Sequence, residues 1–386
     1  MSNGITPDFQ IPTEVFIKPN ILNEIGHIVK RFGTKALIIT TSADFTKYNA
    51  TIEIITRSLN SNNVGSIIYD EIPENPDTEY VDSTVYYAKM TKCDVVIGFG
   101  GIDSINVAKA VALLTNNYIF CNDLFENPAV KPPVSLITIP IIPIFGFELL
   151  PTFYITEIKD MTKKIYNNRD IFPKAIIIDP DIAATSTEEA IADSTISILA
   201  LSTESVVSKK TNDFVNTYAL KSIDLIFKTL PLAFRDPKNI NHRLKLATAS
   251  IMSGIAFATT QLSLTLSISL ALSSKFNITI EKCMGLILPH VMEYNLTSSS
   301  GKYVQMSKVM DEEIRDITVI EAAIKAVEAV RKLEIDVDIP QRLYQFEIAK
   351  SEFTKVAEIA MSYPFLANAP RVLTKDEIET ILIAAY

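Results

Sequence analysis

The feature that most restricts the fold is a long uncharged stretch in the second half of the chain. No Asp, Glu, Lys or Arg occurs between Lys245 and Lys275. Such a stretch must be shielded from water, either by a membrane or by a protein core. It is long enough to span a membrane, but serine and threonine residues interrupt it, and no aromatic or basic flank suits a membrane interface. We therefore expect a buried core helix.

The residue pattern inside this stretch leaves two conformations open. From Leu262 to Leu272, leucine and isoleucine alternate with small polar residues, a period that is typical of a strand. The length of the stretch and its helical neighbours favour a helix. Periodicity alone does not decide between them.

The first half of the chain alternates apolar runs with amphipathic segments. Strands are expected at Thr13–Lys18, Lys35–Thr41, Val64–Tyr69, Asp94–Phe99, Pro133–Ile139 and Ala175–Ile178. Helices are expected at Ile21–Phe32, Ala50–Asn60, Tyr80–Lys92 and Ser104–Leu114. The near-continuous apolar strands are typical of a sheet covered on both faces. This alternation predicts a doubly wound parallel sheet.

From Ser186 onward the strand pattern stops and helical patterns follow. The helices are expected at Glu188–Lys209, Asn212–Thr229, Ile240–Phe257, Ser263–Ser273 and Lys282–Asn295, with several more before Tyr386. The break at Ile178-Asp179-Pro180 suggests a domain boundary. The sequence therefore predicts an α/β domain over residues 1–182 and an all-helical domain over residues 183–386.

Composition excludes several classes of partner. The net charge of −9 and the pI of about 5.1 argue against nucleic acid or an anionic membrane. Cys93, Cys121 and Cys283 have no spacing typical of a disulfide framework or a zinc site. The opening MSNGITPDFQIPTEVF lacks the pattern of a signal peptide, so a cytoplasmic location is expected.

Two residue types that serve nucleotide and metal sites are scarce. There are 11 glycines among 386 residues, where an average usage of about 7% would give about 27. There are only 3 histidines. Glycine allows a backbone to approach a phosphate, and histidine is a common metal ligand and proton carrier. Both scarcities argue against a conventional nucleotide or metal enzyme.

One glycine-rich turn follows a predicted buried strand, at Gly98 to Ser104. In a doubly wound sheet, such a turn opens a helix and receives phosphate groups. However, Asp103 falls where the helix should begin. Its carboxylate would cap the helix, an interaction worth about 1 kcal/mol, and would repel a pyrophosphate. We expect a helix cap here in preference to a phosphate contact.

Several motifs, in the same order along the chain, resemble the iron-containing (group III) alcohol dehydrogenase family. They are Ile72-Pro73-Glu74-Asn75-Pro76, Ile178-Asp179-Pro180, Val207-Ser208-Lys209-Lys210, Leu288 to Asn295 (LPHVMEYN) and Asn368 to Thr374 (NAPRVLT). The resemblance implies a Rossmann-like N-terminal domain, an all-helical C-terminal domain and the fold shared with dehydroquinate synthase. It also implies a cleft for NAD(P) and a divalent metal, and assembly into dimers or, in one branch, filaments.

The resemblance assigns the family's metal ligands to residues that cannot coordinate iron. The ligand positions fall on Ser197, Leu201, Leu266 and Ile280, and a further family histidine falls on Leu270. Aliphatic side chains bury apolar surface and offer no ligand atom. His27, His242 and His290 lie on separate segments and do not replace the set. We therefore expect no iron or zinc at the family site.

The coenzyme motifs are altered as well. The family's G-G-G-S-x-x-D motif falls on Gly100 to Asn106, and its P-T-T-x-G-T-G-S-E loop falls on Pro140 to Glu148. Isoleucine, proline and phenylalanine replace hydroxyl and glycine positions there. The family's acidic residue that binds the ribose hydroxyls is matched by Thr41. The residues left as candidates for a degenerate coenzyme site are Gly100, Gly101, Asp103, Ser104 and Thr41.

These changes predict a catalytically inactive protein with a structural, self-assembling or binding role. No cofactor is expected. The first alternative is an NAD(P)-dependent alcohol or aldehyde oxidoreductase that works without the usual metal, and the second is a sensor for a small apolar ligand. We expect a homo-oligomer, a dimer or a higher assembly, with neither nucleic acid nor membrane as a partner.

Overall fold

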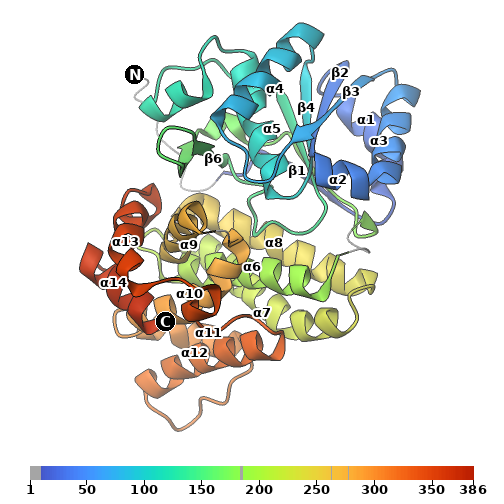
Figure 1. The fold of residues 1–386 in the computed structure, drawn as a ribbon. Coiled ribbons are helices and arrows are strands. Elements are labelled where there is room, and N and C mark those ends of the chain that lie inside the picture. The colour runs from blue at the N-terminus through green and yellow to red at the C-terminus, as the bar shows by residue number, and fades with distance from the viewer. Residues whose placement is uncertain (1–9, 183–185, 262, 277) are drawn as a thin grey trace.

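The computed structural model describes residues 10–182, 186–261, 263–276 and 278–386. In Figure 1 an α/β domain built from the first half of the chain lies against a helical domain built from the second half. The predicted fold class is confirmed. The predicted boundary between residues 182 and 183 adjoins 183–185, which lie outside the described residues, so its position stays a prediction.

A six-stranded parallel sheet forms the middle of the α/β domain, in the order β1-β8-β5-β4-β2-β3. Its strands are β1 (Glu14–Ile17), β2 (Lys35–Thr41), β3 (Gly65–Ile72), β4 (Val95–Gly100), β5 (Ser135–Pro140) and β8 (Ala175–Ile178). Along β2, Ala36 and Ile38 pack in one apolar cluster and Leu37 and Ile39 in another. Both faces of the sheet are covered, as the continuous apolar runs predicted.

Helices cover the two faces of this sheet. They are α1 (Ile25–Val29), α2 (Ser42–Lys47), α3 (Asn49–Ser61), α4 (Thr78–Thr91) and α5 (Ile102–Thr115). In Figure 1, α1 and α3 lie on one side of the sheet, and α4 and α5 on the other. The sequence missed the short α2. It also missed a two-stranded antiparallel hairpin, β6 (Thr152–Glu157) and β7 (Thr162–Asn167).

The second domain is helical throughout its described residues. Its helices are α6 (Glu188–Val207), α7 (Asp213–Arg235), α8 (Ile240–Thr260), α9 (Leu264–Lys275), α10 (Ile280–Asn295), α11 (Ser300–Val309), α12 (Val319–Asp336), α13 (Phe353–Met361) and α14 (Lys375–Ala384). By length and composition α6 passes as a membrane span, but 94% of the qualifying window is buried inside the protein. We interpret α6 as the central core helix of this domain.

The helix α9 resolves the ambiguity of the alternating stretch, whose first residue, Leu262, lies outside the described residues. All residues from Leu264 to Leu272 are buried. The serine hydroxyls donate to carbonyls one turn earlier, Ser267 to Ser263 and Ser269 to Thr265, each at 2.8 Å. Because the helix satisfies these hydroxyls internally, it can be buried on every side. The expected core helix is confirmed.

Candidate functional site

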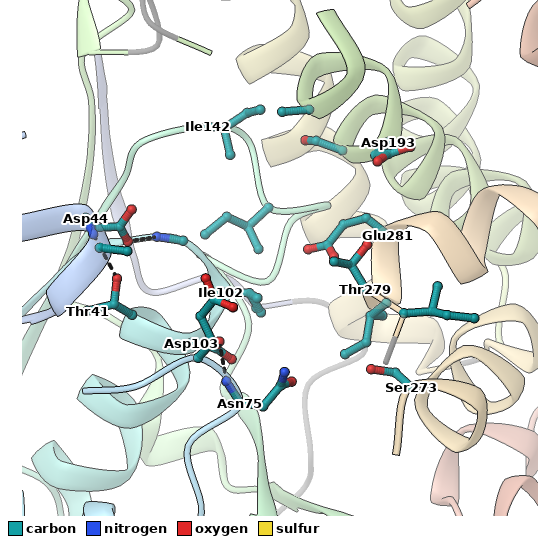
Figure 2. Close-up of a pocket in the computed structure, with 18 of the residues that line it drawn as sticks. Thr41, Asp44, Asn75, Ile102, Asp103, Ile142, Asp193, Ser273, Thr279 and Glu281 are labelled. Carbon is teal, nitrogen blue, oxygen red and sulfur yellow. Dashed lines mark hydrogen bonds between the residues drawn. The ribbon is translucent and has the colours of Figure 1, made fainter. Parts of the chain in front are cut away.

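A cavity of about 450 Å³ lies between the two domains. The α/β domain contributes residues at the carboxyl ends of β2 and β4, among them Thr41 and Gly101, and the helical domain contributes Asp193 on α6 and Glu281 on α10. Figure 2 shows these two sets of side chains on opposite sides of the cavity. This is the edge of a parallel sheet where ligands bind in doubly wound folds.

The glycine turn after β4 forms one wall. Gly100 has φ +138°, and a Cβ there would lie 2.4 Å from Asp44 Oδ2 and 2.5 Å from Ser104 Oγ, so only glycine fits. Ser104 is buried and its Oγ accepts the Thr41 N–H at 3.1 Å. At Gly101 a Cβ would meet nothing within 4 Å. Of the predicted coenzyme contacts in this turn, Gly100 and Ser104 hold the turn itself, while Gly101 lines the open cavity.

Thr41 serves as the N-cap of α2. Its Oγ1 accepts the Asp44 N–H at 3.1 Å. Asp44, which sequence reasoning missed, also lines the cavity, and its Oδ2 accepts the Gly101 N–H at 3.1 Å. Burial raises the pKa of Asp44, although the bond from Gly101 opposes this shift. Thus a carboxylate already occupies the backbone donor that a phosphate oxygen would use.

The prediction that Asp103 caps a helix is wrong. The helix α5 starts at Ile102, one residue before Asp103. Its N-cap residue is therefore Gly101, which has no side chain that could cap the helix. The Asp103 carboxylate instead accepts the Asn75 N–H at 2.9 Å, across the cavity edge. Burial raises the pKa of Asp103, and the nearby Lys163 opposes the shift. A second backbone donor is thereby occupied by a carboxylate.

The β6–β7 hairpin adds two residues that no motif indicated. Tyr154 lines the cavity, is 3% exposed, and its hydroxyl has no hydrogen-bond partner in the described part of the chain. The Lys163 ammonium lies 5.8 Å from the centre of its ring and donates to Asn75 Oδ1 at 3.0 Å. Burial lowers the pKa of Lys163, while Asp103 and Glu281 raise it. A phenol therefore lines the cavity, and a buried cation lies near its ring.

The loop after β5 closes the cavity with apolar residues. Ile142, Pro143 and Ile144 line it, as expected from the loss of hydroxyl and glycine positions. Behind them Glu148 is fully buried, accepting from Ser250 Oγ at 2.7 Å and from the Ile144 N–H at 3.2 Å. These bonds fix the loop, so its apolar side chains form a rigid wall.

The four residues at the family's metal-ligand positions are all buried. Leu201 and Leu266 are 0% exposed and Ile280 is 5% exposed, and all three belong to the main core of the helical domain. The Ser197 hydroxyl donates to the Asp193 carbonyl at 2.9 Å. Over residues 10–182, 186–261, 263–276 and 278–386, no three His, Cys, Asp or Glu side chains form a group that could hold a metal ion. The residues present do not fit iron or zinc.

Two family profiles together match almost the whole chain. The profile described as iron-containing alcohol dehydrogenase matches residues 12–180, and the profile of the C-terminal part of this family matches residues 191–386. The 1,3-propanediol dehydrogenase of Klebsiella pneumoniae is 23% identical over 98% of both chains. The NAD-dependent methanol dehydrogenase of Bacillus methanolicus is 24% identical over 97% of this chain and 98% of the relative.

Solved structures show the same fold. An alcohol dehydrogenase from Oenococcus oeni has a TM-score of 0.94 at 22% identity, covering 99% of this chain and 100% of that one. The sulfoacetaldehyde reductase from Bifidobacterium kashiwanohense, solved in complex with NAD⁺, has a TM-score of 0.86 at 20% identity, with 99% of each chain covered.

These comparisons correct two expectations. The prediction of no cofactor, and of no iron or zinc at the family site, is contradicted, because the matching family is iron-containing and relatives are NAD-dependent or solved with NAD⁺. The predicted inactivity has no support, because the relatives are dehydrogenases and reductases. The oxidoreductase alternative is better supported. The cytoplasmic location, the homo-oligomer and the filament stay predictions.

Proposed function

The chain belongs to the iron-containing alcohol dehydrogenase family, and on that basis we propose that it is an NAD(P)-linked oxidoreductase that interconverts a small alcohol and its carbonyl compound. The observation that carries the proposal is the cavity at the carboxyl edge of the parallel sheet, with Gly101 open toward it. When bound there, the reduced coenzyme supplies hydride. The apolar loop at Ile142 to Ile144 would exclude water from the reacting carbon.

The residues present fit the coenzyme in two respects. The Gly101 and Asn75 amides already bind carboxylate oxygens, which supply the same acceptor chemistry as phosphate oxygens. Gly101 leaves room for a ligand to approach the backbone. Asp44 and Asp103 oppose a pyrophosphate by their charge. Because burial raises the pKa of both, their protonation would release the two amides to an anion.

The residues do not fit the family's metal, and no catalytic step is assigned to one. A carbonyl that receives hydride still requires an electrophile at its oxygen. We assign this role to Tyr154. The carbonyl carbon gains hydride with its electron pair, the carbonyl oxygen takes the proton from Tyr154 Oη, and the phenolate regains a proton from water. The Lys163 ammonium, 5.8 Å from the centre of the ring, would offset part of the cost that burial and the charges of Glu281 and Asp103 place on the phenolate.

A titration of the purified chain with NADH and NADPH, followed by calorimetry, tests coenzyme binding. We expect Gly101→Leu to weaken this binding by about tenfold, because the leucine side chain fills the space that the ligand would occupy. The backbone at Gly101, with φ −77°, accepts any residue. The matched control is Gly301→Leu, since a Cβ at Gly301 also meets nothing within 4 Å. No binding by the wild-type protein, or equal binding by Gly101→Leu, would contradict the proposed coenzyme site.

Coenzyme affinity is expected to depend on pH. The raised pKa of Asp103 and Asp44 means that protonation occurs closer to neutral pH than usual. As the pH falls, Asp44 and Asp103 become protonated and no longer repel the pyrophosphate, so NADH binds more tightly. We expect Asp103→Asn to bind NADH about tenfold more tightly at neutral pH and to show a weaker pH dependence. Glu53→Gln, at an exposed position on α3, removes the same charge as a control; equal effects of both substitutions would argue against Asp103.

A further inference from the structure

The helical wall of the cavity carries a buried carboxylate that has no partner. Asp193, on α6, is 8% exposed and lines the cavity. Its carboxylate makes no hydrogen bond or ion pair with a described residue, whereas its backbone carbonyl accepts from the Ser197 hydroxyl. The nearest cation, Lys282, is bound to Glu189 at 2.5 Å. Burial raises the pKa of Asp193 to about 7, and Glu281 adds to the shift.

Glu281 is a second carboxylate without a side-chain partner, at a half-buried position. It is the second residue of α10 and lines the cavity beside Asp193, as Figure 2 shows. No other side chain of the described residues bonds its carboxylate. The charge of Lys163 acts on Glu281, but that ammonium donates to Asn75 Oδ1 and also interacts with Asp103. Burial is the largest cause of the raised pKa of Glu281, and Asp103 adds to it.

The charge of the cavity is unbalanced as a whole. Carboxylates line it at Asp44, Glu74, Asp103, Asp193 and Glu281. Asp44 and Asp103 are occupied by backbone N–H groups, whereas Asp193 and Glu281 on the helical wall have only the charges of Lys282 and Lys163 nearby and accept no hydrogen bond from a described side chain. Burying an ionised carboxylate without a partner is costly, and proteins normally pair such groups with a cation. The missing partner is therefore a positively charged group in the cavity.

We propose that Asp193 and Glu281 bind a protonated amino group, so that the ligand of this cavity is a small amine. As the substrate of an oxidoreductase, this amine would be an amino alcohol or an amino aldehyde. This substrate class rests on the proposed function, whereas the amine site itself does not. Phe276 and Ile278 line the cavity close in sequence to Glu281 and suit a short alkyl chain. Three hydrogen-bond donors on one ammonium match two carboxylates.

Calorimetric titration with ethanolamine and with ethylene glycol tests the amine site, because the two probes differ mainly in charge. We expect ethanolamine to bind at least about tenfold more tightly. Asp193→Asn and Glu281→Gln, on two different helices, should each remove this preference. Glu188→Gln is the matched control: it removes the same charge from α6, at an exposed residue that does not line the cavity. Circular dichroism checks that each variant is folded.

Equal affinity for the two probes, or a preference that survives both substitutions, overturns the amine site. Binding of Zn²⁺ that depends on Asp193 and Glu281, without amine selectivity, also overturns it. Amine binding without NAD(P)H binding or turnover would reject the proposed oxidoreductase and keep the amine site. Turnover of neutral alcohols without amine selectivity would keep the proposed oxidoreductase and reject the amine site.

Discussion

We expect the Tyr154→Phe variant to reduce its substrate about 100-fold more slowly than the wild-type protein, with NADH affinity unchanged. The substitution removes only the hydroxyl that donates the proton, while the ring keeps its contact with Phe147. Burial, followed by the charges of Glu281 and Asp103, raises the pKa of Tyr154 well above its usual value. The phenol therefore stays protonated, and its proton leaves only when hydride addition makes the carbonyl oxygen strongly basic.

Steady-state kinetics with a panel of aldehydes checks this expectation. Tyr166→Phe is the matched control, because Tyr166 lies in the same hairpin and packs against Phe153 on the opposite face from Tyr154. The loss should appear in kcat and not in KM for the coenzyme. A Tyr154→Phe protein with wild-type kcat would exclude the hydroxyl as the proton donor. A wild-type kcat in this variant would not contradict the proposal that the coenzyme binds at Gly101.

The free energy of unfolding is expected to depend strongly on Glu204. Glu204 on α6 is 2% exposed, and its carboxylate accepts from Ser263 Oγ at 2.5 Å and from the Leu264 N–H at 2.6 Å. It therefore caps α9 from a neighbouring helix. Glu204→Ala leaves these buried donors unsatisfied, and we expect the free energy of unfolding to fall by about 3 kcal/mol. Urea unfolding followed by circular dichroism measures the loss.

Glu204→Gln serves as the control for this effect, since its amide oxygen can still accept a hydrogen bond. It should cost about 1 kcal/mol. Burial raises the pKa of Glu204 from its usual value to about 7. Because the pKa of Glu204 is higher in the folded than in the unfolded protein, the protonated form stabilises the fold fully below the pKa of the unfolded chain. This stabilisation is lost as the pH rises through about 7. Glu204→Gln should flatten this slope; an unchanged slope would place the pH dependence elsewhere.

The sequence predicted the parallel sheet and the core helices because their patterns are local. Lys35–Thr41 matches β2 residue for residue, since a strand buried on both faces is a continuous apolar run. The β6–β7 hairpin was missed because Phe153, Tyr154 and Ile155 are all buried, which hides the alternation of a strand. Missing the hairpin also hid Lys163, a buried lysine that charge patterning would place in water.

The site was less predictable than the fold because it forms between distant segments. Asp193 and Glu281 belong to no motif of the resembling family, and only the packing of α6 against α10 brings them to one cavity. Asp103 was assigned a cap because the start of α5 was placed two residues late. A shift of this size changes which backbone donor a carboxylate reaches. The apolar replacement of ligand positions by Leu201 and Leu266 suggested inactivity, whereas the electrophile that we propose, Tyr154, lies elsewhere in the wall.

Hydride transfer is proposed to occur in the cavity between the two domains. The most direct measurement uses NADH labelled with deuterium at its transferable position, incubated with the purified protein and an aldehyde. Mass spectrometry of the alcohol then reports whether the label arrives on the former carbonyl carbon. We predict stoichiometric transfer by the wild-type protein and a much slower transfer by Tyr154→Phe. Absence of labelled alcohol across a panel of neutral and amine-bearing aldehydes would contradict the assignment as an oxidoreductase.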